Sequence, residues 1–233
     1  IRFIQDTAKF KYSYNFDWMG RPIIQLPQDI IAMQELIWRV KPDLIIETGV
    51  AHGGSLALSA SMLALLDYSD AVTSKTIVDP FNSKRKVLGI DIDIRAHNRV
   101  AVEQHPMSHL IQMIEGSSIA PKIVQEVHDI SKDYECILVC LDSNHTHDHV
   151  LAELESFAPL TSVGSYCVVF DTIIEDMSVD AFPDRPWGIG NNPKTAVKEF
   201  LKSHLEFKID EEFQNKLLIS VAPDGYLKRV STS

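Results

Sequence analysis

The feature that most constrains this chain is the stretch from Leu44 to Ser55, which reads Leu-Ile-Ile-Glu-Thr-Gly-Val-Ala-His-Gly-Gly-Ser. An apolar run typical of a buried strand ends in an acidic residue, Glu47, and a glycine-rich turn leads into a segment with helical character. Glycine allows a sharp turn and a close approach of the backbone to a ligand, because it has no Cβ. The stretch therefore predicts a strand, a turn and a helix, with a ligand at the turn.

The chemistry of the turn indicates what kind of ligand it suits. Unpaired amides at the start of a helix favour a negative group, whereas a carboxylate at the end of the strand would hold a cationic amine. A site that offers both suits an amino-acid-like ligand, such as one end of S-adenosylmethionine. We predict that the cofactor is contacted by Glu47, Gly49, Ala51, Gly53, Gly54 and Ser55.

Two other interpretations of this turn remain open. A dinucleotide-binding turn shows the pattern G-x-G-x-x-G, but the glycines here fall at positions 49, 53 and 54, so the initial G-x-G is missing. A turn without any ligand is the second alternative, because α/β proteins need such turns between strands and helices.

Apolar runs alternate with helical patterns along the rest of the chain. The patterns predict strands at 44–47, 86–91, 111–114, 137–141, 166–170, 217–221 and 226–230, and helices at 28–39, 55–66, 94–104, 119–131, 147–157 and 193–205. We expect residues 67–86 to form an exposed, irregular excursion. The order predicts an α/β fold, Rossmann-like and of the class I methyltransferase layout. It has a mostly parallel seven-stranded sheet, helices on both faces and an antiparallel last strand.

The chain divides into two expected parts. Residues 1–27 form an aromatic-rich arm, which we interpret as a lid or an oligomer contact. Residues 28–233 form the S-adenosylmethionine-binding domain, since 233 residues suit one large domain better than two.

Composition excludes some partners. With 22 basic and 32 acidic residues the formal net charge is -10, which disfavours nucleic acid as a partner because phosphate binding relies on clustered Lys and Arg. No apolar run is long enough to predict a membrane span, and no basic-then-apolar pattern of the kind typical of a secretory leader is found in the sequence. The three cysteines lie in apolar runs without zinc-type spacing. We interpret them as reduced thiols of a cytoplasmic protein.

Four of the predicted parallel strands end in an acidic residue: Glu47, Asp91, Asp142 and Asp171. Ligands of doubly wound sheets bind beyond the carboxyl ends of the strands, so these side chains should meet at one edge. Four carboxylates together are costly without a cationic partner or a metal.

Two of the predicted strand ends favour nucleoside contacts. The position of Asp91 suits hydrogen bonds to the ribose hydroxyls, with helix capping as the alternative. Ser117 and Ser118 follow the third strand and could reach the adenine edge, although an ordinary helix cap explains them equally well.

Several strings of this sequence resemble the cephalosporin hydroxylase family, which also contains rhamnosyl O-methyltransferases. These strings are residues 15–29, 42–55, 89–93, 116–118, 141–145, 164–172 and 187–193. The resemblance implies an S-adenosylmethionine-dependent O-methyltransferase that acts on a hydroxyl of a rhamnose-like sugar or another small natural product. It also implies homo-oligomers and, in some members, a divalent metal. The alternative is an accessory protein that binds S-adenosylmethionine without catalysing transfer.

The resemblance assigns roles to the stretch Asp142-Ser-Asn-His145. Asp142 would ligate a metal near the methyl donor. His145 could take the proton from the acceptor hydroxyl, because an imidazole has an unperturbed pKa of ~6.5. His147 and His149 are expected to lie at a solvated helix start.

The remaining metal ligands are less regular. Family members with a metal tend to have two adjacent acidic or amide residues at the end of the fifth strand, whereas Phe170 precedes Asp171 here. Asp171 is a predicted ligand, and Glu175 or Asp176 could replace the missing one. An oxygen-only set suits Mg²⁺ or Mn²⁺. Residues 184–193, with an Arg and a Trp, are expected to face carbohydrate.

Overall fold

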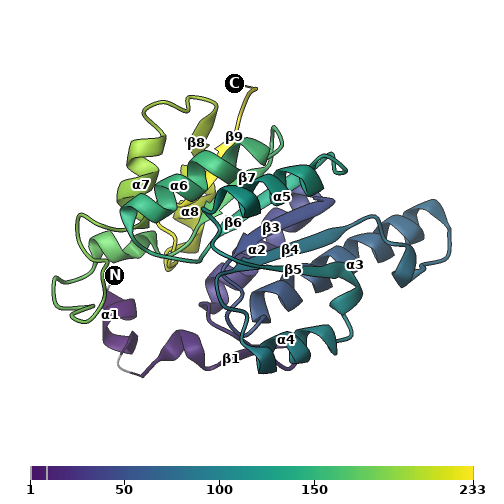
Figure 1. Cartoon of the computed structure of the whole chain (residues 1–233), viewed down its shortest axis with the longest axis horizontal. Coiled ribbons are helices and arrows are strands. Elements are labelled where there is room, and N and C mark those ends of the chain that lie inside the picture. Colours follow the sequence, from purple (N-terminus) through teal and green to yellow (C-terminus); the bar gives the residue numbers. More distant parts are fainter. Residues whose placement is uncertain (1, 9, 233) are drawn as a thin grey trace.

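A seven-stranded sheet forms the centre of the computed structural model, which describes residues 2–8 and 10–232 (Figure 1). The strand order is β5-β4-β3-β6-β7-β9-β8. The strands are β3 (Leu44–Thr48), β4 (Lys86–Asp91), β5 (Ile111–Glu115), β6 (Ile137–Leu141), β7 (Tyr166–Val169), β8 (Phe207–Ile209) and β9 (Tyr226–Arg229). Strands β3 to β7 pair in parallel, and β9 runs antiparallel to both β7 and β8. The predicted sheet, including its antiparallel last strand, is confirmed.

Helices cover both faces of the sheet. They are α2 (Pro27–Val40), α3 (Gly54–Ser74), α4 (Ala96–Glu103), α5 (Pro121–Ser131), α6 (His147–Phe157), α7 (Pro193–Phe200) and α8 (Glu211–Leu217). Successive side chains of a strand point to opposite faces, and β3 shows this. Ile45 belongs to a core with α2, α3 and α8, whereas Leu44 and Ile46 belong to a core with α5, α6 and α7. Both faces are therefore apolar, as the unbroken apolar run of β3 predicts.

The prediction of a strand at 217–221 is wrong. Helix α8 occupies 211–217, and the strand that pairs with the outer edge of β9 is β8, ahead of that helix. The Asp210 side chain accepts a hydrogen bond from the Phe213 amide and so caps α8. Phe213 is buried against the Tyr166 and Tyr226 rings. This capped helix with a buried aromatic anchor ends at Leu217, and residues 218–221 follow it as irregular backbone instead of the expected strand.

Helix α3 is longer than predicted. It continues to Ser74 through a segment that we expected to be irregular. Arg85 forms ion pairs with Asp67 and Asp70, which lie on one face of the helix three residues apart. These pairs tie the end of α3 to the chain that leads into β4.

The N-terminal arm packs beside the glycine-rich turn. It contains α1 (Arg2–Ala8), a short 3₁₀ helix η1 (Tyr12–Tyr14) and a hairpin of β1 (Phe16–Trp18) and β2 (Arg21–Ile23). The Trp18 indole donates a hydrogen bond of 2.9 Å to the Ser61 hydroxyl on α3. A Cβ on Gly54 would clash with the backbone of Pro22, so only glycine lets the hairpin lie against the start of α3.

None of the described helices combines the length and the apolar character that a membrane span requires.

Candidate functional site

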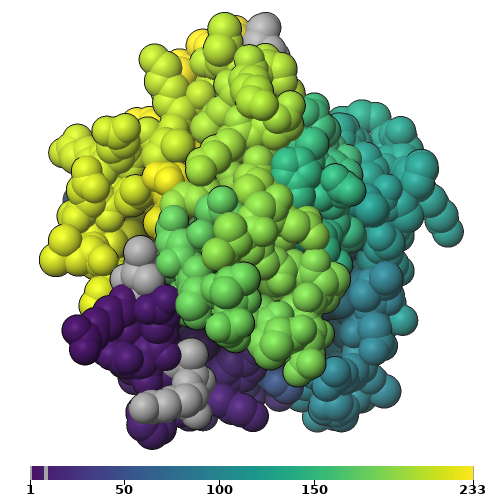
Figure 2. Space-filling model, turned by 90° about the vertical axis from the view of Figure 1, so that its left-hand side faces the viewer, coloured from purple at the N-terminus to yellow at the C-terminus, as the bar shows by residue number. Residues whose placement is uncertain are grey.

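The carboxyl ends of the parallel strands open into a large cavity. Its volume is about 1080 Å³, and it is lined by the N-terminal arm, the glycine-rich turn, the loop after β6 and the segment after β7. Figure 2 shows the arm (purple) beside the segment that follows β7 (green). The cavity lies where a doubly wound sheet binds its ligands, and its volume is at the upper end of small-molecule pockets, roughly 300–1,000 Å³.

The glycine-rich turn is fixed by backbone packing. Gly49 has a φ of 92°, and a Cβ there would clash with the Asp142 carbonyl oxygen. The turn therefore lies directly against the start of the loop that carries Asp142. We predicted glycine here because of a ligand, and the structure shows a second reason, the approach of two backbone segments.

Side chains from three elements brace the same turn. One carboxylate oxygen of Asp91 accepts hydrogen bonds from the Val50 amide at 2.8 Å and the Ala51 amide at 3.2 Å. Asn98 donates to the Ala51 carbonyl at 2.9 Å, and Arg21 donates to the His52 carbonyl at 2.9 Å. Helix α4 begins at Ala96, so Asp91 does not cap it. Sequence reasoning missed Arg21 and Asn98, which act only through the backbone of a distant turn.

Glu47 lies beneath the turn, outside the cavity lining. The residue is 4% exposed, and its carboxylate is 3.5 Å from the Ser59 hydroxyl. Burial raises the pKa of Glu47 to about 7, and hydrogen bonds from Ser55 and Ser59 oppose that rise. The structure thus places Gly49, Ala51, Gly54 and Ser55 in the cavity wall, with Glu47 behind them as a support of the turn.

We expect the Glu47→Gln variant to change how stability depends on pH. Because the pKa of Glu47 is raised in the folded protein, its stabilising contribution is full below the unfolded-state pKa and is lost as the pH rises through about 7. The loss amounts to about 3 kcal/mol between pH 4 and pH 8. Urea unfolding across this range should show the wild type losing stability relative to the variant by about that amount. Parallel pH curves would contradict the buried position of Glu47.

The serines after β5 meet the start of α6. Ser118 is buried, and its hydroxyl is 3.1 Å from His149 Nε2. The Ser143 hydroxyl donates to the buried Glu153 carboxylate at 2.6 Å, and His149 lies 3.5 Å from the same carboxylate. Ser118 therefore serves an internal network, while Ser117 remains partly exposed.

The two histidines on α6 have protein partners. His149 belongs to the network around Glu153, and His147 Nδ1 is 2.8 Å from the Thr195 hydroxyl on α7. The expectation of a solvated helix start for these two side chains is therefore wrong.

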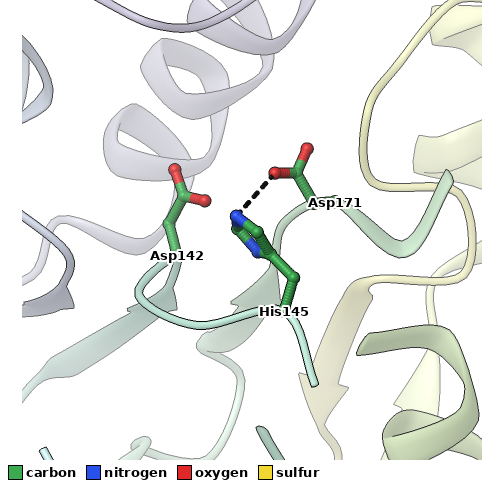
Figure 3. Close-up of side chains that lie close together, drawn as sticks. All are labelled: Asp142, His145 and Asp171. Atoms are coloured by element: carbon green, nitrogen blue, oxygen red, sulfur yellow. Dashed lines mark ion pairs between the residues drawn. The ribbon is translucent and has the colours of Figure 1, made fainter. Parts of the chain in front are cut away.

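Asp142, His145 and Asp171 point toward one another from the loops after β6 and β7 (Figure 3). One potential ligand atom of each lies within 4.8 Å of the others, and His145 Nε2 is 3.3 Å from an Asp171 carboxylate oxygen. Asp171 has a φ of 55°, a left-handed conformation that is unfavourable outside glycine and is often retained at functional sites. Two of the predicted metal ligands and the predicted base thus form one cluster.

The electrostatics of this cluster fit a divalent cation. Burial raises the pKa of Asp142 well above its usual value, and the negative charges of Asp171, Glu47, Glu153 and Asp29 raise it further. Among the described residues, no Lys or Arg forms an ion pair with Asp142 or Asp171. The charged partner of Asp171 is His145. A bound cation would therefore supply the positive charge that these carboxylates lack.

Glu175 and Asp176 lie apart from the cluster. The Glu175 carboxylate accepts hydrogen bonds from the Gly190 amide at 2.8 Å and from the Asn192 side chain. Asp176 forms an ion pair of 2.6 Å with Lys194. Both acids fasten the segment after β7 to the start of α7, so the structure gives them a structural role where we expected a ligand.

Trp187 contributes a wall to the cluster. Its ring meets the His145 imidazole edge to face, with centroids 4.8 Å apart, and the Arg185 guanidinium lies 5.1 Å from the centroid of the same ring. The sequence indicated a loop that faces carbohydrate, but not this contact with His145.

Comparison with known proteins identifies the family. Residues 10–230 match the model of the family described as Rhamnosyl O-methyltransferase/CmcI. The rhamnosyl O-methyltransferase of Mycobacterium bovis (strain BCG / Pasteur 1173P2) is 30% identical over 214 residues, which cover 91% of this chain and 77% of that protein. The Mycobacterium leprae (strain TN) enzyme of the same name is 28% identical over 214 residues, 91% of this chain and 82% of that protein.

Solved structures share the fold. CmcI with Mg and SAM superposes with a TM-score of 0.59 at 18% identity, covering 94% of this chain and 78% of that chain. CalS11, a TDP-rhamnose 3'-O-methyltransferase of calicheamicin biosynthesis, superposes with a TM-score of 0.53 at 17% identity, covering 78% of this chain and 74% of that chain. The resemblance seen in the sequence is thus confirmed, and this chain belongs to the rhamnosyl O-methyltransferase/CmcI family.

Proposed function

We propose that this protein transfers the methyl group of S-adenosylmethionine to a hydroxyl of a rhamnose-like sugar. The observation that carries the proposal is the Asp142, His145 and Asp171 cluster, which opens into the cavity beside the glycine-rich turn. The names of the relatives support the reaction and the class of acceptor.

The cofactor contacts are proposed at the turn and at Asp91. When bound, S-adenosylmethionine supplies a methyl group on a sulfonium sulfur. The cavity wall at Gly49, Ala51 and Ser55 would contact its amino-acid end. The Asp91 carboxylate already accepts three backbone hydrogen bonds, from Val50, Ala51 and Asp93. Because its two oxygens together offer about four lone pairs, it can still accept one ribose hydroxyl. Ser117 is the remaining candidate for the adenine edge.

Asp142 and Asp171 would hold the divalent ion. Their carboxylates suit Mg²⁺, and an imidazole nitrogen in the same cluster makes Mn²⁺ equally suitable. When bound, the ion supplies Lewis-acid polarisation of the acceptor oxygen.

His145 is the proposed general base. As the new C–O bond forms and the S–C bond breaks, the proton of the acceptor hydroxyl passes to the imidazole. Asp171 and the Trp187 ring hold that imidazole in orientation. For this step the cavity wall would hold the acceptor oxygen, the methyl carbon and the sulfur in line. Positioning of this kind supplies a large part of the rate acceleration in enzymes.

The proposal also covers the N-terminal arm, the oligomeric state and the location of the protein. Residues 1–27 would act as a lid over the domain of residues 28–233, because arm residues line the cavity. The protein would form homo-oligomers, because the apolar side chains Tyr68, Val72 and Phe81 are exposed and exposed apolar patches mark contacts between proteins. The protein would be cytoplasmic, because its three cysteines are free thiols and disulfides are rare in that compartment.

Methyl transfer to sugars tests the proposal directly. Calorimetry should show that S-adenosylhomocysteine binds the wild type and binds the Asp91→Ala variant at least tenfold more weakly. Labelled S-adenosylmethionine should then methylate a rhamnoside, and EDTA should suppress the reaction until Mg²⁺ or Mn²⁺ is restored. Cofactor binding without transfer to any sugar or other hydroxyl compound would favour the accessory-protein alternative.

A further inference from the structure

The side-chain amide of Gln25 is a buried polar group whose oxygen has no partner. Gln25 is only 5% exposed, and its Oε1 accepts no hydrogen bond from any described residue. Buried polar groups of folded proteins are nearly always hydrogen-bonded, because an unpaired one has lost its contact with water without gaining another partner. Gln25 also lines the cavity at the carboxyl ends of the strands. An unpaired amide in a cavity wall indicates a contact that a ligand completes.

The backbone places Gln25 beside the glycine-rich turn. Strand β2 ends at Ile23, and a Cβ on Gly54 would lie 2.6 Å from the Ile23 Cα. Gln25 follows Ile23 by two residues, a separation of at most about 7 Å along an extended chain. Gly54 opens α3, and both Gly54 and Gln25 line the cavity. Gln25 therefore reaches the cavity near the start of α3, where the amino-acid end of S-adenosylmethionine is proposed to lie.

The amino-acid end of this cofactor has a carboxylate and an ammonium group, which need different partners. The carboxylate suits the start of α3, where no side chain caps the helix and the first amides lack helical partners. The ammonium group needs acceptor oxygens. Glu47, the acceptor that the sequence indicated, lies beneath the turn and outside the cavity lining. Asp142 and Asp171, the carboxylates that do line the cavity, are proposed to hold the ion.

We infer that Gln25 binds the ammonium group of S-adenosylmethionine through its side-chain oxygen. The inference rests on the proposed function, because it adds a cofactor contact to the proposed methyltransferase. No hydrogen bond to another described residue fixes the amide. Its terminal torsion is of the broad, roughly two-fold kind, so a rotation can turn Oε1 toward the cavity. An amide oxygen accepts from an ammonium group, and hydrogen bonds with one charged partner are about twice as strong as neutral ones.

Three ligands that share the nucleoside and differ at the other end test the inference. S-adenosylhomocysteine has both the amine and the carboxylate, S-adenosyl-3-thiopropylamine has only the amine, and 5′-methylthioadenosine has neither. Calorimetry on the Gln25→Met variant should show that the first two bind roughly tenfold to hundredfold more weakly than they bind the wild type. The affinity for 5′-methylthioadenosine should stay unchanged, because this ligand has no ammonium group to lose a partner.

The Gln25→Glu variant distinguishes the oxygen of the amide from its nitrogen. An ionised carboxylate keeps the acceptor and has no donor. At a pH where the new carboxyl group is ionised, this variant should bind S-adenosyl-3-thiopropylamine at least as tightly as the wild type does. If Gln25→Met and Gln25→Glu both weaken S-adenosylhomocysteine and both leave S-adenosyl-3-thiopropylamine unchanged, the amide donates to the carboxylate of the cofactor and the inference is wrong.

Gln28→Met is the matched control. Gln28 lies in the first turn of α2, and its Oε1 also lacks a partner among the described residues, but Gln28 is outside the cavity lining. This variant should keep all three affinities, and urea unfolding of each variant shows whether it is folded. Unchanged S-adenosylhomocysteine binding in a folded Gln25→Met variant, or an equal loss for 5′-methylthioadenosine, would overturn the inference. A wild type that binds none of the three ligands would count against the proposed function itself.

Discussion

The Asp142→Asn variant is expected to lose methyl transfer by about a thousandfold or more, because a Lewis acid in such a site supplies several kcal/mol of transition-state stabilisation. Asn keeps the shape of the side chain and removes its charge. Mn²⁺ titration followed by electron paramagnetic resonance should therefore show a large loss of affinity in the same variant. Calorimetry should show that S-adenosylhomocysteine still binds, since Asp142 is proposed to hold the ion rather than the cofactor.

Glu175→Gln and Asp176→Asn are the matched controls for this experiment. Each removes one carboxylate charge from the segment after β7, and each of these carboxylates is engaged with α7 or its approach. We expect both variants to bind Mn²⁺ as the wild type does, with some loss of stability. If Asp142→Asn keeps the wild-type affinity for Mn²⁺ while a control loses it, the ion lies elsewhere and the proposed metal site is wrong.

The sheet could be predicted from the sequence because its signals are local. The apolar runs at 86–91 and 137–141 give strands with those bounds, and the helix predicted at 147–157 has the observed bounds as well. The acidic residues at the strand ends then follow from the topology, since parallel strands bring their carboxyl ends to one edge. This is why Asp142 and Asp171 could be named as neighbours before any coordinates.

The errors come from contacts between residues far apart in the chain. Glu175 resembled a free ligand in the sequence, but Asn192 and the Gly190 amide, provided by a later loop, satisfy its carboxylate. Residues 217–221 resembled a strand, yet Asp29 on α2 accepts hydrogen bonds from Ser220 and from the Val221 amide and holds them as irregular backbone. No local pattern contains either partner.

The glycine-rich turn shows a different limit of sequence reasoning. A glycine is required wherever a Cβ would clash, and the clashing group can be a ligand or another part of the chain. At Gly49 the clashing group is the Asp142 carbonyl, and at Gly54 it is the backbone of Pro22. The turn thus joins the proposed cofactor site to the loop of Asp142 and to the N-terminal arm. The sequence of the turn alone could not show whether its glycines are required by a ligand or by these two contacts.

The His145→Ala variant is expected to lower kcat by ~10²–10⁴, the usual contribution of a positioned base. The affinity for S-adenosylhomocysteine should stay nearly unchanged, because a group that acts only in the chemical step affects kcat and kcat/KM together. His147→Ala is the matched control. The His147 imidazole bonds Thr195 on α7, so its loss should cost some stability and leave kcat close to the wild-type value.

Metal affinity decides between the two roles that the geometry allows for His145. A ring nitrogen of His145 lies close enough to both carboxylates to be a third ligand as well as a base. If His145→Ala lowers kcat but binds Mn²⁺ like the wild type, the imidazole acts on the hydroxyl proton. If Mn²⁺ affinity falls in step with kcat, and saturating Mn²⁺ restores turnover, His145 is a ligand and the proposed base is wrong. Full turnover in the variant on a good acceptor would exclude both roles, and the carboxylates with their ion would then suffice to activate the hydroxyl.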